Sequence, residues 1–197
     1  MECIAAAFRI VSLLKIVNMP SYRTYIQQLK FNGIEYTKGD AVDILEEYNV
    51  VCEDFPFMLY PKSKQLPALD WPGRDGQDVY TPDKLPLDDY DIDVEFLCNG
   101  TEESVRADIA SFCKFLTGRN DGAIGCRLAV YNEYNGIGRK DVVVSEINND
   151  LFFLSENDPD AVAKFKVKFH VYDPSTDVTP VYETVGGVKK ISQLNFE

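Results

Sequence analysis

Two segments of this chain alternate apolar and charged residues with a period of two. In Tyr90 to Cys98 (YDIDVEFLC), Ile92, Val94 and Phe96 fall on one side and acidic residues fall on the other. Because successive side chains of a β-strand point to opposite faces of a sheet, such alternation predicts a strand with one buried face. The segment Ala161 to Asp173 alternates in the same way and should expose a basic ladder, made of Lys164, Lys166, Lys168 and His170.

Further strands are predicted on both sides of these two. Leu29 to Tyr36 (LKFNGIEY) places apolar residues around Asn32-Gly33, a dipeptide typical of two-residue hairpin turns. Apolar runs also predict strands in NVVCEDFPFMLYP, GCRLAVYNE, DVVVSEI and DLFFLSE, with a hairpin tip at YNGIGRK. Ala41 to Tyr48 (AVDILEEY) fits either a helix or a strand. Near the end of the chain, VYETVGGVKKI indicates a hairpin around Gly186-Gly187.

One helix is predicted at about residues 101–117. Thr101 can cap its N-terminus, and Glu102 and Glu103 lie in the first turn, where the helix dipole favours carboxylates. Gly118 ends the helix after an apolar stripe at helical spacing, which contains Val105, Ile109, Phe112, Cys113 and Leu116. The order of strands, loop, strand, helix and further strands predicts a mainly β (α+β) fold, an antiparallel β-sandwich or barrel-like domain with one flanking helix.

The chain is expected to form one domain with an attachment at each end. Residues 1–27 are predicted to be a helical N-terminal extension, because CIAAAFRIVSLLKIV is apolar but carries Arg9 and Lys15 and is too short to span a bilayer. No membrane insertion is therefore expected, and Met19 is an alternative candidate for the translation start. Residues 28–174 are predicted to form the β-domain, and residues 175–197 a C-terminal hairpin and tail.

Charge and cysteine usage narrow the class of protein. The net charge of −12 argues against nucleic-acid binding through phosphate neutralisation, which needs clustered Lys and Arg. The odd number of cysteines and the absence of a CxxC motif are typical of reduced thiols in a cytoplasmic product, not of a disulfide frame or a zinc site. The five cysteines are Cys3, Cys52, Cys98, Cys113 and Cys126.

The sequence offers no set of catalytic or metal-binding residues. Asp89, Asp91 and Asp93 have the spacing that opens a calcium loop, but the glycine and glutamate required at the sixth and twelfth positions are missing, so a solvated strand face is favoured. His170, the only histidine, has no Ser or Cys near it in the sequence. A glycosidase carboxylate pair cannot be identified from spacing alone. We predict no enzymatic activity, no metal and no cofactor.

A polar insert separates two of the predicted strands. Leu69 to Lys84 (LDWPGRDGQDVYTPDK) contains the only Trp, two Pro, and two Gly around an Arg-Asp pair. We predict a contact surface: the glycines would permit positive φ, the tryptophan would anchor an interface, and the Arg-Asp pair would form ion pairs within the loop or between subunits. The candidate interface residues are Trp71, Gly73, Arg74, Asp75 and Gly76.

The ordered set of these features resembles a known family. The hairpin LKFNGIEY is followed by PGRDG (Pro72 to Gly76), a strand, a helix of about four turns, further strands, and a closing strand that ends in YDP (Tyr172 to Pro174). This set resembles the N-terminal domain of the distal tail proteins of tailed bacteriophages, over about Leu29 to Pro174. The resemblance implies a β-sandwich with a flanking helix that assembles as a homohexameric ring, where the tail tube meets the host-recognition apparatus.

The same resemblance implies a structural virion protein that is made in the bacterial host cytoplasm. Its partners would be other copies of itself, the tail-tube protein, and tail hub, fibre or tape-measure proteins, while DNA would pass through the lumen without specific binding. Many members continue into a carbohydrate-binding-like domain, and the last 25 residues are too few to form one. Two alternatives stay open: another tail part, such as a tail-tube subunit or tail terminator, or a carbohydrate-binding β-sandwich that stacks sugars on exposed Tyr and Trp71.

Overall fold

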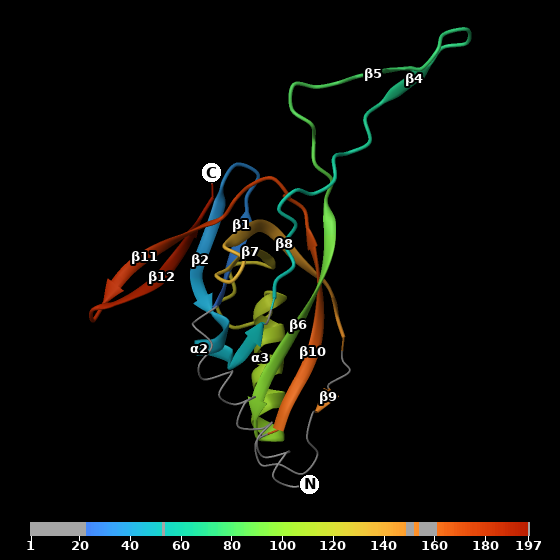
Figure 1. Cartoon of the computed structure of the whole chain (residues 1–197). Helices are drawn as coiled ribbons and strands as arrows, with labels where there is room; N and C mark the ends of the chain where they lie inside the picture. Colours follow the sequence, from blue (N-terminus) through green and yellow to red (C-terminus); the bar gives the residue numbers. More distant parts are fainter. Residues whose placement is uncertain (1–22, 53, 149–151, 154–160, 197) are drawn as a thin grey trace.

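The computed structural model describes residues 23–52, 54–148, 152–153 and 161–196 (Figure 1). Its largest unit is an antiparallel sheet of eight strands with the order β2-β1-β7-β8-β10-β6-β3, and β9 pairs with the first part of β10. The strands are β1 (Thr24–Phe31), β2 (Tyr36–Asp43), β3 (Val50–Cys52), β6 (Tyr90–Gly100), β7 (Arg127–Asn132), β8 (Ile137–Ile147), β9 (Phe152–Phe153) and β10 (Ala161–Val171). The fold is therefore mainly β with added helices (α+β), as the sequence predicts.

Two hairpins and two helices complete the described structure. They are β4 (Ala68–Asp70) with β5 (Gln77–Val79), β11 (Thr179–Val185) with β12 (Val188–Asn195), α2 (Ile44–Tyr48) and α3 (Glu102–Leu116). The sheet must curve strongly, because its edge strands β2 and β3 are joined through the five-residue helix α2. α2 contacts both of these edge strands and α3. The curved sheet and the helices enclose one main core.

The main core lies between α3 and one face of the sheet. Phe96 on β6 is central to it: its ring centroid is 5.2 Å from that of Phe112 on α3 and 5.4 Å from that of Phe165 on β10. All three rings are buried. Full burial of a large apolar side chain contributes about 2 to 3 kcal/mol. This aromatic cluster is therefore the main attachment of the helix to the sheet.

The ends of α3 agree with the predicted helix at 101–117. The hydroxyl of Thr101 accepts a hydrogen bond from the Ser104 backbone N–H at 3.3 Å, so the threonine is the N-cap. At the other end, Gly118 has a φ of 66°, a left-handed conformation in which glycine avoids the steric cost of a Cβ. The buried side of α3 contains Val105, Ile109, Phe112, Phe115 and Leu116.

The hairpin β11–β12 covers the other face of the sheet at its β2–β1–β7 end. A second, smaller core forms there, from Tyr25, Leu29, Ala129, Val178, Ile191 and Leu194. Gln27 is fully buried in β1 and accepts a hydrogen bond from the Leu194 backbone N–H at 3.3 Å. The C-terminal hairpin is therefore confirmed, and both Gly186 and Gly187 in its turn have positive φ.

The first strand begins earlier than the sequence analysis expects. β1 starts at Thr24, so residues 24–27 belong to the sheet and not to a helical N-terminal extension, while residues 1–22 lie outside the described residues. The strand lacks clear alternation because both of its faces are covered, and its first six residues are all buried. Gln28 in this strand donates a hydrogen bond to the Phe115 carbonyl at 2.7 Å, which ties β1 to the end of α3.

The lysines and the histidine of β10 lie on the face away from the core, as the alternation predicts, but β6 neutralises their charge. The pairing of β10 with β6 sets each cationic residue opposite an acidic residue or close to one. The ammonium groups of Lys166 and Lys168 lie 2.7 and 3.3 Å from carboxylate oxygens of β6. The charges thus pair within one chain and leave no net basic surface on this strand. The opposed pairs are Lys166–Glu95, Lys168–Asp93 and His170–Asp91.

Two ambiguous segments combine different structures. Ala41 to Tyr48 contains the end of β2 and then α2, which Asp43 caps by accepting a hydrogen bond from the Leu45 backbone N–H at 3.0 Å. In the run NVVCEDFPFMLYP, predicted as a strand that prolines end, the described strand is β3, Val50–Cys52; residue 53 lies outside the described residues, and residues 54–61 form no strand. In the described parts of the chain, no helix has the length and apolar character needed to cross a membrane.

Candidate interaction site

A long arm leaves the body of the protein between β3 and β6 (Figure 1). We define the arm as residues 62–88. Two backbone hydrogen bonds close its root: the Asp88 N–H donates to the Lys62 carbonyl at 2.7 Å, and the Lys64 N–H donates to the Pro86 carbonyl at 2.8 Å. Near its tip the arm contains the short hairpin β4–β5, three residues in each strand. The predicted insert, Leu69 to Lys84, therefore forms most of this arm.

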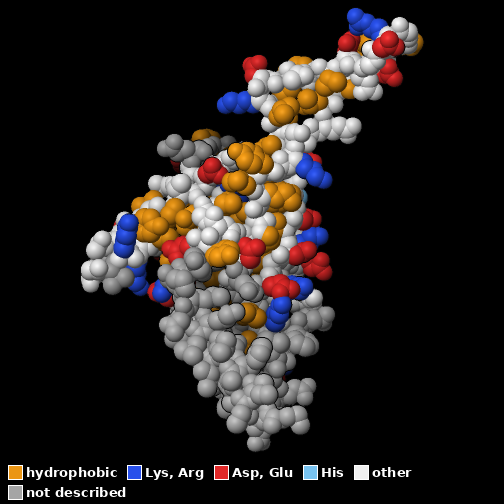
Figure 2. Space-filling view, in the orientation of Figure 1, with side chains coloured by type: hydrophobic (Ala, Val, Ile, Leu, Met, Phe, Trp, Pro, Cys, Tyr) orange, Lys and Arg blue, Asp and Glu red, His pale blue; other side chains and the backbone are white. Residues whose placement is uncertain are grey.

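The arm has no core of its own. Every residue from 67 to 81 is exposed. Eight of the fourteen large hydrophobic side chains that are exposed in the described structure lie in the arm or just before it, namely Met58, Leu59, Tyr60, Leu69, Trp71, Val79, Tyr80 and Leu85. Figure 2 shows these hydrophobic side chains along the arm and where it joins the body. Apolar side chains concentrated on a projecting segment make the arm a candidate contact surface. An isolated two-stranded hairpin is also only marginally stable in water.

The predicted interface residues all lie at the tip of the arm. Gly73 and Gly76 have φ values of 88° and 82°, as expected for a tight excursion, and a Cβ at either position would meet open space. The Arg74 N–H donates to the Trp71 carbonyl at 3.1 Å, which closes the turn. Trp71 is 51% exposed and packs into no core cluster of the described structure. Its role as an interface anchor stays a prediction.

The ion pair at the tip differs in part from the expectation. Arg74 pairs with Asp78 at 3.1 Å, whereas Asp75 forms no ion pair with any other described residue. The side chains of Arg74 and Asp78 are 70% and 61% exposed, so the pair contributes less than about 1 kcal/mol to stability. The arginine therefore stays accessible for contact with another molecule.

Sequence reasoning missed the apolar residues around the predicted tip. Leu69 and Val79 flank it on β4 and β5, and Tyr80 follows directly after β5. Tyr60, just before the root, is 89% exposed. Such residues have no helical or strand periodicity that would separate them from core residues. The only sign that they lie outside the core was their position between prolines, because prolines interrupt regular secondary structure.

A buried arginine holds the root of the arm against the sheet. Arg139 on β8 donates from Nη2 to the Met58 carbonyl at 3.1 Å, and its Nη1 contacts the Asp177 carboxylate. The Tyr90 hydroxyl accepts a hydrogen bond from the Met58 backbone N–H at 3.3 Å. Burial raises the pKa of Tyr90 above its ordinary value, so the hydroxyl stays protonated. The arm is thus anchored at Met58 by two residues of the sheet.

His170 forms a second anchor near the root. Its Nδ1 lies 2.6 Å from an Asp91 carboxylate oxygen, and its Nε2 lies 2.7 Å from an Asp89 carboxylate oxygen. The hydrogen bond with Asp91 raises the pKa of His170 most, with a further increase from Asp89. The hydrogen bond with His170 lowers the pKa of each aspartate. These partners are carboxylates and not a nucleophile, so the geometry is that of an ion-pair cluster.

The described residues offer little for metal or thiol chemistry. No cluster of three or more His, Cys, Asp or Glu side chains suited to a metal ion occurs among them. Burial raises the pKa of the Cys98 thiol to about 12 and also raises the pKa of Cys113. Since the thiolate is the reactive form, both cysteines are inert at neutral pH.

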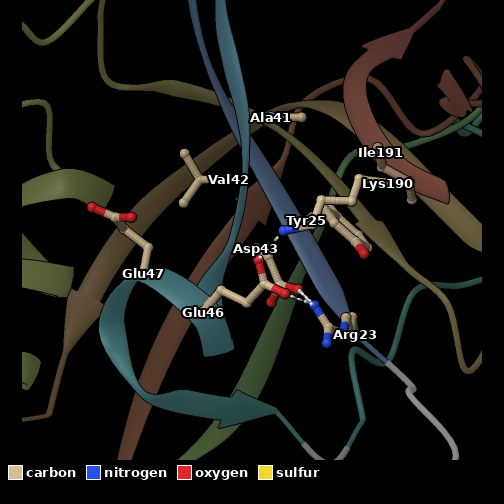
Figure 3. A pocket seen from close by; sticks show the side chains of 9 residues that line it. All are labelled: Arg23, Tyr25, Ala41, Val42, Asp43, Glu46, Glu47, Lys190 and Ile191. Carbon is tan, nitrogen blue, oxygen red and sulfur yellow. Dashed lines mark hydrogen bonds and ion pairs between the residues drawn. The ribbon is translucent and has the colours of Figure 1, made fainter. Parts of the chain in front are cut away.

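A surface pocket of about 250 Å³ lies beside β2, α2 and β12 (Figure 3). In it the Arg23 guanidinium faces the carboxylates of Asp43 and Glu46, and the Lys190 Nζ lies 3.1 Å from the same Glu46 carboxylate. The hydrogen bond from Arg23 is the main cause that lowers the pKa of Glu46. These charges satisfy one another and fasten β12 to α2. We assign this pocket a structural role.

Comparisons of the chain with protein-family models, curated proteins and solved structures found no match in any of the three.

Proposed function

We propose that this chain is a structural, non-enzymatic subunit of the distal tail ring of a tailed bacteriophage. The observation that carries the proposal is the arm, residues 62–88, whose tip is fully exposed and carries apolar side chains on a well-packed body. Burial of these side chains against another copy would remove apolar surface from water at about 25 cal/mol per Å². The antiparallel sheet with one flanking helix agrees with the architecture that the resemblance implies.

A ring needs two different surfaces on each subunit. In a heterologous interface the contact patch of one copy meets a different patch on the next, and a suitable rotation closes the ring. The arm supplies one such surface, because it projects away from the body on one side (Figure 1). We propose a homohexamer in which the arm of each subunit lies against its neighbour, with Trp71 as an anchor and Arg74 as a charged contact.

The proposed ring joins the tail-tube protein to hub, fibre or tape-measure proteins and leaves a lumen for DNA. The net charge of −12 supports passage without specific binding, because an excess of carboxylates repels phosphates. The basic strand face that could have paired subunits is neutralised within the chain by β6. We therefore assign the contact between subunits to the arm. In this proposal the protein is made in the host cytoplasm and becomes part of the virion.

The test is the oligomeric state of the full chain, measured by native mass spectrometry and negative-stain electron microscopy. We expect closed rings for the wild type, and a shift to monomers for the double variant Trp71→Ala/Tyr80→Ala with unchanged thermal stability, since both side chains are exposed. Tyr182→Ala is the matched control, an exposed aromatic on β11 outside the arm. A wild type that stays monomeric at every concentration would overturn the proposal.

The same experiment separates the two alternatives. Long polymers in the micrographs would favour a tail-tube subunit, because tube subunits stack instead of closing into single rings. A monomer that binds a defined glycan, with binding lost in Trp71→Ala, would favour a carbohydrate-binding module. The arm would be the contact surface in either case only if the Trp71→Ala/Tyr80→Ala variant abolished the polymers or the glycan binding.

A further inference from the structure

The root of the arm carries a cluster that depends on one proton. Both ring nitrogens of His170 lie within hydrogen-bond distance of a carboxylate, Asp91 at 2.6 Å and Asp89 at 2.7 Å. A carboxylate accepts hydrogen bonds but cannot donate them, and a neutral imidazole donates from only one nitrogen. Only the protonated imidazolium can satisfy both aspartates at once. The geometry therefore selects the charged form of the histidine.

Asp89 connects this cluster to the arm. The ladder between β6 and β10 ends with the pair Tyr90 and Val171, so Asp89 is the first residue beyond the ladder. Asp88, the next residue, belongs to the arm and donates its N–H to the Lys62 carbonyl on the opposite side of the root. A bond from His170 to Asp89 thus holds the returning strand of the arm against the sheet. Asp91 lies within β6 and keeps its position without this bond.

We propose that protonated His170 clamps the root of the arm through Asp89. Loss of the proton from Nε2 leaves the remaining Nδ1–H on Asp91, the nearer carboxylate at 2.6 Å, and releases Asp89 and the arm. The consequence for assembly rests on the proposed function: a clamped arm is preorganised for contact with a neighbouring copy, and a released arm must lose more conformational entropy on binding. The clamp itself belongs to a single subunit and does not depend on assembly.

The charged and titratable groups around His170 are few. From β6 and its approach, Asp89 and Asp91 favour the proton, and Asp93 lies one pair further along the ladder. On β10, Lys168 contacts Asp91 at 3.3 Å and opposes the proton.

On β8 the direct neighbour of His170 is Val143, which does not titrate. Glu146 on β8 pairs with Lys168 across the ladder. The ring of Tyr172 packs edge-on against the ring of His170, with 4.3 Å between the two centroids. The two aspartates are therefore the main charges that act on the His170 ring. A raised histidine pKa means that the clamp is complete below 6.5 and is lost as pH rises through the folded-state value.

The chain contains one histidine and one tryptophan, which makes the test direct. The imidazole resonances of His170 in NMR report its titration, and the time-resolved fluorescence anisotropy of Trp71 reports the mobility of the arm tip. Both are measured on the full chain against pH. We expect a His170 midpoint above 6.5, and an amplitude of fast Trp71 depolarisation that rises through the same midpoint.

Three variants make the proposal falsifiable. His170→Gln and Asp89→Asn should both show high, pH-independent mobility of Trp71; in Asp89→Asn the histidine midpoint should also fall toward 6.5. Lys164→Gln removes a cation six residues away on the same strand, paired with Glu95, and should keep the wild-type pH response. Trp71 mobility that ignores the His170 titration, or a pH response that survives in His170→Gln, would overturn the clamp.

The clamp and the proposed function can fail separately. A pH-dependent arm on a protein that never forms rings would support the clamp and contradict the ring. Rings whose subunits show no pH-dependent arm mobility would support the ring and contradict the clamp. If both hold, native mass spectrometry should detect less ring as pH rises through the His170 midpoint.

Discussion

The guanidinium of Arg139 donates a hydrogen bond to the carbonyl oxygen of Met58 at 3.1 Å, just before the chain enters the arm. Arg139 is only 2% exposed, and its other terminal nitrogen contacts Asp177 in the segment that leads to β11. One buried cation therefore joins the central sheet, the root of the arm and the C-terminal segment. The segment that enters the arm is therefore tied to the body of the protein at Met58.

Arg139→Met should destabilise the protein while roughly preserving the volume of the side chain. The Met58 carbonyl would lose its charged donor, and a hydrogen bond from a charged group contributes about 2 kcal/mol. The free energy of unfolding, measured by urea denaturation, should fall by about this amount. Glu102→Gln is the control, because its ion pair with Arg106 joins side chains that are 66% and 56% exposed, so its change should cost little. Equal losses in the two variants would contradict the anchoring role.

Arg74→Glu should impair ring assembly and leave the folding of the monomer unchanged. The arginine lies at the arm tip in an exposed pair with Asp78, so reversal of its charge affects a neighbouring copy more than its own chain. Arg106→Glu provides a close match, since Arg106 forms an exposed i,i+4 pair with Glu102 on α3. Size-exclusion chromatography with light scattering gives the assembled fraction. Normal assembly of Arg74→Glu would mean that the arm tip is an exposed connecting loop that makes no contact between subunits.

Much of the fold was predictable because its strands and helix carry local signals. The alternation in β6 and the cap and stripe of α3 identify these elements from their own residues. The ladder on β10 was correctly placed on the outer face, but its neutralisation was missed for a non-local reason: only the pairing of β10 with β6 brings carboxylates opposite the lysines. β1 was partly missed since burial on both faces removes alternation.

The sequence predicted where the candidate site lies, but not which residues hold the root of the arm. The glycines and prolines of Leu69 to Lys84 correctly indicated a tight excursion. The anchors at the root could not be found, because Arg139 and His170 lie far from the arm in sequence and reach it only through the sheet. A single arginine or histidine within a strand pattern gives no sign of its partner.

Gly138→Ala should destabilise the fold where the C-terminal segment crosses β8. A Cβ at Gly138 would lie 2.8 Å from both the Val178 carbonyl oxygen and the Val178 Cβ, closer than side chains tolerate. Backbone must move, and such overpacking costs about 2 kcal/mol. Gly39→Ala is a matched strand control whose closest contact would be the Ile124 side chain at 3.3 Å. We expect thermal melts to show a clearly larger decrease for Gly138→Ala, and the reverse order would contradict the close approach.

Cys98 should resist alkylation in the folded protein. Burial raises the pKa of its thiol to about 12, so almost none of the reactive thiolate forms near neutral pH. Cys126 is exposed and should react with iodoacetamide under the same conditions. Peptide mass spectrometry can compare the two residues with and without urea, which should remove the difference. Equal labelling in the native state would show that the β6–α3 core opens readily.

The stability of the whole chain should decrease as pH rises through the titration of His170. The pKa of His170 is raised above 6.5 in the folded state, so the folded protein binds this proton more tightly than the unfolded chain does. The stabilisation is complete below 6.5 and is lost above the folded pKa. Asp89 and Asp91 act on the acid side, where their lowered pKa values preserve their contribution until pH falls below 3.8.

Urea denaturation over this pH range checks the sign. The wild type should lose stability across the upper part of the range, and His170→Gln should not. Lys164→Gln is again the control. Its ion pair with Glu95 lies further along the ladder and does not involve His170, so the pH dependence should match that of the wild type. The same pH slope in the wild type and in His170→Gln would mean that the histidine proton does not contribute to folding. The neutral ring would then donate to only one of the two carboxylates, and the anchor at Asp89 would be weaker than the charged geometry implies.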